Sequence, residues 1–292
     1  MKIALFGQNF KEEYIPILEK IISVLTKNNI EIFVEDSYAL EIKKIITLNA
    51  EVSIVKNINS SKIDTLISIG GDGTMLRAAS LVSNSEIPLL GINTGRLGFL
   101  ATVNSNEIEL QLNKLIAGQF TFSNRSIISI SASPKIEDEN FLNFALNEVT
   151  VSRKDTTSMI SIETTIDNEY LTTYWADGLI VATPTGSTGY SLSCGGPVVS
   201  PNADCFVITP IAPHNLNARP LILKDDSVVK LKVNGREEQN LVSLDSRIIS
   251  VPNGTEITIS KAPFRIKLIE FENESFLKTL REKLLWGEDK RN

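Results

Sequence analysis

Apolar and polar positions follow two different patterns along this chain, and the change comes near residue 120. Up to residue 117, short apolar runs are separated by segments whose apolar residues recur three and four positions apart, the spacing of one helix face. This pattern predicts parallel strands joined by helices. The expected strands are Lys2–Phe6, Glu31–Val34, Thr65–Ile69 and Pro88–Ile92, and the expected helices are Glu12–Thr26, Leu40–Leu48, Thr74–Ser80 and Asn106–Ala117.

From about residue 120 onward the pattern favours strands separated by turn residues. Asn234-Gly235 and Asn253-Gly254 are typical of hairpin turns, which indicates an antiparallel, β-sandwich-like domain. The expected strands are Ser126–Ser131, Ala145–Val151, Met159–Ile166, Leu179–Ala182, Val228–Val233, Leu241–Leu244, Ile248–Val251, Glu256–Ser260 and Arg265–Ile269.

These patterns divide the chain into three parts. Residues 1–120 are expected to form an α/β domain with a parallel sheet, and residues 121–270 a β-rich domain. Residues 274–285 return to helical spacing, so 271–292 are expected to form a C-terminal helix that packs back on the first domain.

Composition excludes several classes of protein. The chain has 292 residues, 42% of them hydrophobic, and a net charge of −6, which argues against a nucleic-acid or anionic-membrane partner. No apolar run reaches the roughly 18 residues of a membrane span. The two cysteines have no paired-ligand spacing and no secretory pattern is present, so we expect a cytoplasmic protein with reduced thiols. His214 is the only histidine, which excludes a His-rich zinc site and assigns acid–base chemistry to carboxylates.

One glycine-rich loop stands directly after the strand Thr65–Ile69. It reads Gly70-Gly71-Asp72-Gly73-Thr74 and leads into a predicted helix. Glycine allows backbone N–H groups to approach phosphate closely, and the helix N-terminus favours the same anion. A carboxylate there would repel phosphate unless it binds a metal, accepts a proton or holds a sugar hydroxyl, so Asp72 indicates phosphoryl transfer. The loop is neither a Walker loop nor Gly-x-Gly-x-x-Gly, and a purely structural turn remains the alternative.

Three further segments have a composition suited to a site. Asn93–Leu100 follows a strand and contains two glycines, so it is expected to form another loop at the same end of the sheet, with a simple turn as the alternative. Asn147-Glu148 is flanked by apolar residues, and an amide beside a carboxyl group can clamp a vicinal diol, although an exposed strand pair would look the same. Ala176–Pro197 is rich in glycine, serine and threonine between apolar strands, as expected of a segment that orients a large polar ligand, or of a long surface loop.

Taken in order, these motifs resemble those of the bacterial ATP-NAD kinase family. The resemblance covers about residues 1–285. It rests on Gly70–Thr74, Asn93–Leu100, Asn147-Glu148, Asp177–Pro197 and Pro213-His-Asn-Leu-Asn-Ala-Arg-Pro220. The first loop also occurs in lipid kinases and 6-phosphofructokinases, whereas the two later segments are much more specific.

The resemblance implies an activity and a set of site residues. The family transfers a phosphoryl group from ATP or another donor, with a divalent metal such as Mg²⁺, to the 2′-hydroxyl of the adenosine ribose of NAD. By resemblance Asp72 accepts the hydroxyl proton, and Gly70, Gly71, Gly73 and Thr74 form the phosphate loop. The implied NAD-binding residues are Asp72, Gly73, Arg77, Asn147, Glu148, Asp177, Thr188, Gly189, Tyr190, Ser191, Leu192, Ser193, Ala212 and Arg247. The metal ligands are not implied by any motif.

The resemblance also implies a homodimer or homotetramer, in which Ala212 reaches the dinucleotide of a neighbouring subunit. The chain departs from the family pattern at Asp245-Ser246-Arg247, where Asp-Gly-Gln is frequent, and at Gly189, where alanine is common. His214 and Arg219 are interpreted as core and interface residues. Two alternatives are a lipid kinase of the diacylglycerol or sphingosine type, which shares the glycine loop, and a non-catalytic NAD-binding regulator.

Overall fold

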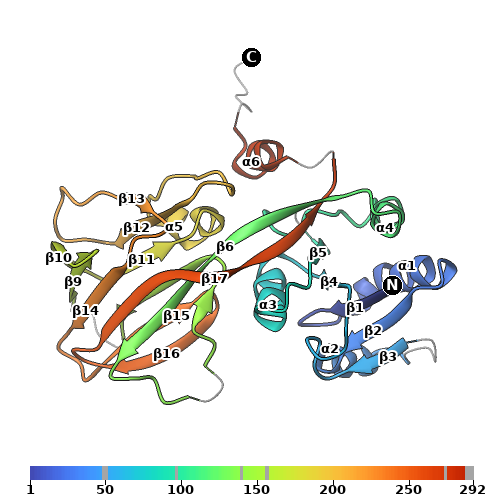
Figure 1. Ribbon diagram of the computed structural model, residues 1–292, viewed down its shortest axis with the longest axis horizontal. Coiled ribbons are helices and arrows are strands. Elements are labelled where there is room, and N and C mark those ends of the chain that lie inside the picture. The colour runs from blue at the N-terminus through green and yellow to red at the C-terminus, as the bar shows by residue number, and fades with distance from the viewer. Residues whose placement is uncertain (48–51, 96–97, 139–140, 155–157, 273–274, 287–292) are drawn as a thin grey trace. The chain divides into compact units, whose positions relative to one another are not determined.

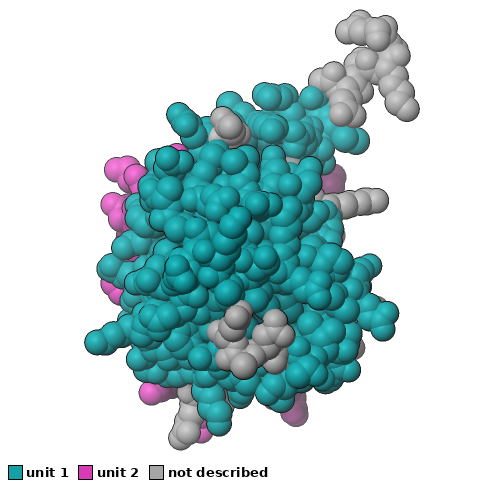
Figure 2. All heavy atoms as spheres, turned by 90° about the vertical axis from the view of Figure 1, so that its right-hand side faces the viewer, with its two compact units in different colours: residues 1–124, 266–292 teal, residues 125–265 magenta. Residues whose placement is uncertain are grey.

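The structure is a computed structural model that describes residues 1–47, 52–95, 98–138, 141–154, 158–272 and 275–286 (Figure 1). The chain forms two compact units, one made of residues 1–124 and 266–292 and the other of residues 125–265. They are coloured separately in Figure 2. The chain passes from one unit to the other within two long strands, β6 (Thr121–Ser133) and β17 (Glu256–Glu270). No helix in the described part of the chain is both long enough and apolar enough to cross a membrane.

The first unit contains a parallel sheet with the strand order β5-β4-β1-β2-β3. These strands are β1 (Lys2–Phe6), β2 (Glu31–Glu35), β3 (Val52–Val55), β4 (Thr65–Ile69) and β5 (Leu89–Ile92). The order reverses between β1 and β4, because the chain moves outward in one direction from β1 and in the other from β4. In such sheets ligands bind at the carboxyl ends of the strands beside the reversal, where the glycine loop after β4 lies.

Helices cover both faces of this sheet, as the sequence predicts for a parallel α/β unit. Leu5, Ile67 and Ile92 belong to the core that also contains buried residues of three helices, α1 (Ile15–Lys27), α2 (Asp36–Lys43) and α4 (Ile108–Ile116). Successive side chains of a strand point to opposite faces. A Cβ at position 91 would therefore point to the opposite face, where Met75 of α3 (Asp72–Val82) lies.

The second unit is a β-sandwich built from antiparallel strand pairs. One sheet has the order β13-β12-β11-β8-β15-β16, and the other contains β10-β9-β14 and the first part of β17. Buried apolar residues of both sheets, such as Val181 of β11 and Leu231 of β14, form one core. The strands are β7 (Phe144–Ala145), β8 (Glu148–Arg153), β9 (Ile160–Ile166), β10 (Glu169–Ala176), β11 (Gly178–Ala182), β12 (Cys205–Ile211), β13 (Leu221–Lys224), β14 (Val229–Asn234), β15 (Gln239–Leu244) and β16 (Arg247–Pro252).

The fold class is confirmed, while several elements differ from the sequence prediction. The pattern missed β3, β10, β12 and β13, and it divided the continuous strand β17 into two because Lys261 and Pro263 interrupt its apolar run. Helix α2 begins at Asp36, four residues before the prediction, because the Glu35 side chain accepts the Tyr38 N–H and so caps the helix there. The predicted end at Leu48 lies outside the described residues.

The C-terminal helix α6 (Phe276–Leu284) belongs to the first unit, as the sequence predicts. Its first residue, Phe276, packs against Phe99 with ring centroids 6.2 Å apart. Phe99 lies in the loop after β5, so α6 contacts a loop at the carboxyl end of the parallel sheet. Three short helices complete the fold: η1 (Glu12–Tyr14), η2 (Thr185–Thr188) and α5 (Tyr190–Ser193).

Candidate active site

The glycine loop between β4 and α3 places backbone N–H groups at an open helix N-terminus. Gly70 has φ +154°, and a Cβ on it would lie 2.3 Å from the Thr74 Oγ1, so this position requires glycine. Gly71 caps α3, and a Cβ on Gly71 or Gly73 would meet nothing within 4 Å. The loop is therefore open on the side of these two glycines, as close approach by an anion requires.

The Asp72 carboxylate is held by the loop that follows β5. Its Oδ2 accepts the N–H of Phe99 at 2.8 Å, and its Oδ1 accepts those of Leu100 at 3.0 Å and Ala101 at 3.1 Å. A Cβ on Gly98 would lie 1.9 Å from Oδ1, so only glycine allows this approach. The second glycine loop thus holds the carboxylate of the first, and its residues 96–97 lie outside the described residues.

Two other polar side chains of the first unit belong to this region. Gln8, in the loop after β1, accepts a hydrogen bond from the Thr74 hydroxyl at 3.3 Å. We missed Gln8 in the sequence, although Gly7 and Gln8 follow a predicted strand at the same end of the sheet. Arg77 is exposed on α3, and no ion pair or hydrogen bond of its guanidinium is found within the described part of the chain.

In the second unit, Asn147 and Glu148 lie at the beginning of β8. The expectation that both belong to one strand is wrong, because Asn147 lies in the bend before β8 and Glu148 is its first residue. The Asn147 Oδ1 and the Glu148 Oε2 are buried and have no hydrogen-bond partner among the residues that the structure describes. Since buried polar atoms are normally paired, two adjacent ones without partners indicate a ligand site.

The Asp245 carboxylate fixes the backbone of this pair. It accepts the N–H groups of Leu146 at 2.9 Å, of Asn147 at 2.7 Å and of Glu148 at 3.3 Å. In return the Asp245 N–H donates to the Glu148 carbonyl oxygen at 3.0 Å. Asp245 has φ +53°, a left-handed conformation that aspartate tolerates better than most residues, in the turn between β15 and β16.

Burial controls the protonation of both carboxyl groups. Burial and the neighbouring Asp245 charge raise the pKa of Glu148 to about 8, while the Tyr190 backbone N–H acts in the opposite direction. Burial also raises the pKa of Asp245, but its three N–H donors and Arg247 lower it. Because Glu148 Oε2 has no such donors and the pKa of Glu148 is raised to about 8, the Glu148 carboxyl group is protonated at neutral pH.

The glycine- and threonine-rich segment after β11 packs directly on Asn147-Glu148. The Thr183 hydroxyl donates to the Leu146 carbonyl oxygen at 2.6 Å, and the Thr183 backbone N–H donates to the Asn147 carbonyl oxygen at 2.8 Å. A Cβ on Gly186 would lie 2.0 Å from the Asn147 backbone carbonyl oxygen, and a Cβ on Gly189 would lie 2.8 Å from the Glu148 Oε2. Two glycines of this segment therefore leave room for the pair.

The other predicted residues of this segment differ in their surroundings. Tyr190 is exposed, and its phenol interacts with the neighbouring Cys194 thiol, which contributes, after burial, to raising the Tyr190 pKa. The Ser191 hydroxyl is buried against that of Thr209 at 2.8 Å, so it faces the core. The Thr188 hydroxyl donates to the Thr185 carbonyl oxygen, while Leu192 is half-buried and Ser193 is exposed.

Asp177 and Arg247 both take part in charged contacts. Asp177 pairs with Arg153 at 3.1 Å, and both side chains are half-exposed. The Arg247 guanidinium donates to the carbonyl oxygens of Leu142 and Phe144 and lies over the Phe144 ring, 5.3 Å from its centroid. Arg247 therefore binds the backbone that precedes Asn147-Glu148.

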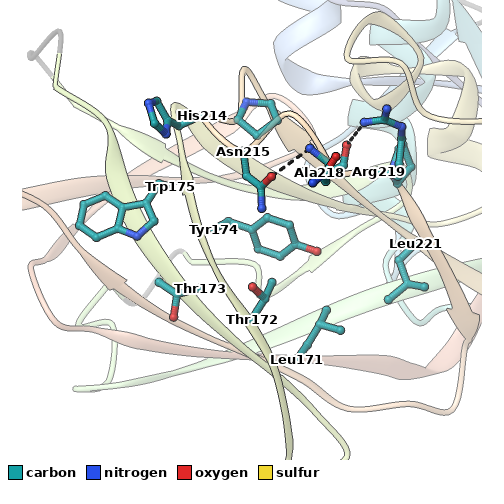
Figure 3. Close-up of a pocket in the computed structure, with 13 residues that line it drawn as sticks. Leu171, Thr172, Thr173, Tyr174, Trp175, His214, Asn215, Ala218, Arg219 and Leu221 are labelled. Atoms are coloured by element: carbon teal, nitrogen blue, oxygen red, sulfur yellow. Dashed lines mark hydrogen bonds between the residues drawn. The ribbon is translucent and has the colours of Figure 1, made fainter.

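The segment after β12 lines a pocket on the second unit. Its volume is about 450 Å³, and Trp175, His214 and Arg219 contribute to its wall (Figure 3). His214 and Arg219 are exposed, so neither is a core residue, and their interpretation as interface residues stays a prediction. The Arg219 guanidinium donates to carbonyl oxygens of its own loop. Ala212 is exposed with φ +44° at the start of this segment.

The described residues contain no group of three or more His, Cys, Asp or Glu side chains that could hold a metal ion. Mg²⁺ in phosphoryl-transfer sites is commonly held by one or two carboxylates together with substrate phosphates and water. The described side chains therefore form no dedicated metal cage.

Three comparisons with known proteins agree with one another. Residues 3–120 match the ATP-NAD kinase N-terminal domain, and residues 146–271 match the ATP-NAD kinase C-terminal domain. The chain is 57% identical to an NAD kinase of Flavobacterium psychrophilum and 53% identical to one of Flavobacterium johnsoniae, with all of both chains covered in each case.

Two solved structures have the same fold. Yeast NADH kinase complexed with NADH aligns with a TM-score of 0.89 at 24% identity, covering 100% of this chain and 89% of that one. An NAD kinase from Archaeoglobus fulgidus in complex with ATP aligns with a TM-score of 0.74 at 27% identity, covering 98% of this chain and 99% of that one. The two family domains, the full-length relatives and the site geometry lead to one conclusion: the chain belongs to the ATP-NAD kinase family, a family of enzymes.

Proposed function

We propose that this chain transfers the γ-phosphoryl group of Mg²⁺-ATP to the 2′-hydroxyl of the adenosine ribose of NAD, with Asp72 as the general base. The observation that carries this proposal is the Asp72 carboxylate, which three backbone N–H groups fix beside an open glycine helix N-terminus. Relatives at more than 50% identity carry the name NAD kinase, which supports NAD as the acceptor.

The hydrogen bonds of Asp72 suit a base that must be both fixed and available. Oδ1 accepts two N–H groups and Oδ2 accepts one. Oδ2 therefore keeps a lone pair for the hydroxyl proton, while the three bonds hold its direction. General-base help of this kind contributes about 10²–10⁴-fold, and the N–H groups of Gly71 and Gly73 would stabilise phosphate oxygens.

The second unit supplies the proposed recognition of NAD. The unpartnered Asn147 Oδ1 and Glu148 Oε2 would bind the hydroxyls of a ribose, with the segment that contains Gly189 alongside. The further proposed NAD contacts are Arg77, Asp177, Thr188, Gly189, Tyr190, Ser191, Leu192, Ser193, Ala212 and Arg247. Since the Ser191 hydroxyl is committed to Thr209, Ser191 would contribute through its backbone.

The environment of the enzyme follows from the same proposal. We place it in the cytoplasm, where ATP and NAD are available. We also propose a homodimer or homotetramer in which Ala212 approaches the dinucleotide of the neighbouring subunit. Light scattering on a size-exclusion column tests the assembly, and a monomer at assay concentration would contradict it.

The activity is tested with purified protein, Mg²⁺ and ATP, offered NAD, NADH and diacylglycerol in separate reactions. We expect NADP formation, read by an NADP-specific dehydrogenase, and no labelled lipid.

Asp72→Asn should lower kcat by about 10²–10⁴-fold and leave the Kd for NAD within threefold, because the variant loses the base but keeps its shape. Asp36→Asn, at the first turn of α2, is the matched control and should keep full activity. NADP formation by Asp72→Asn within tenfold of the wild type would refute the role of Asp72, and a lipid product without NADP would replace the proposed function.

A further inference from the structure

The turn between β15 and β16 packs against the backbone of Asn147-Glu148. Asp245 accepts three consecutive N–H groups from residues 146–148, and its own N–H binds the Glu148 carbonyl oxygen. Two residues later, Arg247 binds the carbonyl oxygens of Leu142 and Phe144. A single turn thus holds the chain on both sides of the bend that presents Asn147.

Within the proposed function, we propose that Asp245 is a positioning residue for the Asn147-Glu148 pair. Its carboxylate fixes the backbone of the pair, and its charge keeps the Glu148 side chain protonated, so that Glu148 Oε2 presents an O–H donor to a substrate hydroxyl.

The first support is the arrangement of hydrogen bonds around the Glu148 carboxyl group. The backbone N–H of Tyr190 acts to lower the pKa of this group, while Oε2 is buried and has no hydrogen-bond partner in the described part of the chain. A protonated Oε2 therefore donates to no protein acceptor and is available to a ligand. An ionised Oε2 in the same place would be a buried charge without a donor, which is costly.

The second support is the distribution of charge around Glu148. The titratable groups whose charges interact with Glu148 are Asp245 of the β15–β16 turn and Cys194 of the segment after β11, while Arg247 acts on Asp245. Asp245 is the group among them whose charge raises the pKa of Glu148. Arg247 lies 3.9 Å from Asp245 and moderates its charge. The pKa of about 8 for Glu148 agrees with this balance.

A protonated Glu148 has a consequence for substrate binding. NAD carries a negatively charged pyrophosphate, so a neutral clamp binds the ribose without adding a repelling charge. As the pH rises through about 8, Glu148 loses its proton, the O–H donor is replaced by a charge, and affinity for NAD falls.

The direct test is the carboxyl resonance of Glu148, followed by NMR in protein labelled with ¹³C at the glutamate carboxyl carbons and assigned with Glu148→Gln. We expect a titration midpoint near pH 8 in the wild type. Asp245→Asn should move the midpoint to lower pH by about one unit or more, and Arg247→Gln should move it to higher pH. A merely structural role of Asp245 and Arg247 would lower thermal stability in both variants without shifting the Glu148 titration midpoint in opposite directions.

Asp225→Asn is the matched control, because Asp225 is another buried carboxylate of the second unit but pairs with Lys261. It should lower the thermal midpoint and leave the Glu148 titration unchanged. If Asp245→Asn does not fold, the Glu148 titration midpoints of Arg247→Gln and of the wild type still test whether the charges at this turn control the protonation of Glu148. A wild-type midpoint in the ordinary carboxyl range, near pH 4, or the same midpoint in all folded variants, would overturn the inference.

The kinetic test uses the KM for NAD between pH 6 and 9.5 at saturating Mg²⁺-ATP. We expect KM to rise about tenfold from pH 7 to 9.5 while kcat changes less, and this rise should disappear in Glu148→Gln, which keeps a donor and an acceptor. Activity with a flat KM profile would refute the inference and leave the proposed function intact. A protein that forms no NADP but shows the NMR shifts would refute the proposed function and retain the role of Asp245 toward Glu148.

Discussion

Substitution of Gly98 by alanine tests whether the loop after β5 holds Asp72 in its working position. The added Cβ would lie 1.9 Å from the Asp72 Oδ1, where real contacts are at least 3.0 Å. Either the carboxylate or the loop must then move by about 1 Å or more. Such a displacement weakens the bonds from Phe99, Leu100 and Ala101, because all three donors belong to the same loop.

The size of the effect follows from this displacement. A misplacement of about 1 Å costs about 10²-fold in rate, which corresponds to about 2.7 kcal/mol in the activation free energy. Weakening three hydrogen bonds to a charged group also lowers the free energy of unfolding, by about 1.5–3 kcal/mol if one of them is lost. We therefore expect kcat to fall about 10²-fold and the thermal midpoint to fall by several degrees.

The assay measures kcat and KM for NAD at saturating Mg²⁺-ATP, together with thermal unfolding. Gly95→Ala is the matched control, because it lies in the same loop and its Cβ would meet nothing within 4 Å. We expect Gly95→Ala to resemble the wild type in both measurements. A Gly98→Ala enzyme with kcat within threefold of the wild type would refute the argument that this loop positions Asp72.

The remaining predictions concern the other contacts of the two candidate loops. Gly186→Ala would place a Cβ 2.0 Å from the Asn147 carbonyl oxygen. We therefore expect the Kd for NAD, measured by calorimetry, to rise at least tenfold. An unchanged affinity would contradict the packing described for the segment after β11. Phe276→Ala removes the aromatic contact of α6 with Phe99, whose N–H donates to Asp72. We therefore expect a several-fold loss of kcat with the KM for NAD unchanged. A change in KM alone would argue against an effect of α6 on Asp72 through Phe99.

Much of the α/β unit could be predicted from the sequence, because its information is local. The strand from Lys2 to Phe6 and the strand from Thr65 to Ile69 were predicted with their observed bounds, since each is a short apolar run bounded by polar residues or glycine. The strand Cys205–Ile211 was missed because it contains a proline and follows a glycine-rich segment, and its neighbours in the sheet, β11 and β13, stabilise it.

The chemistry of the candidate site is divided in the same way. The composition of the glycine loop indicated a phosphate site with a carboxylate, because glycine conformation and helix N-termini act over a few residues. The donors to Asp72 lie 27 to 29 positions later, and nothing in the local pattern indicates them. The bend that contains Asn147 was also not predicted, because its backbone is held by Asp245, 98 positions away.

The sequence by itself determined the two fold classes, the glycine loop and the identity of the residues that can carry phosphoryl transfer. Only the tertiary structure decided which of them are held in place and in which protonation state. Gly98 is one glycine among many in the sequence, and it becomes indispensable only where the loop after β5 meets Asp72. Glu148 is an ordinary carboxyl group in the sequence, and burial beside Asp245 raises its pKa. The physical reason is that hydrogen bonds and burial depend on which strands become neighbours, and local patterns do not specify strand order.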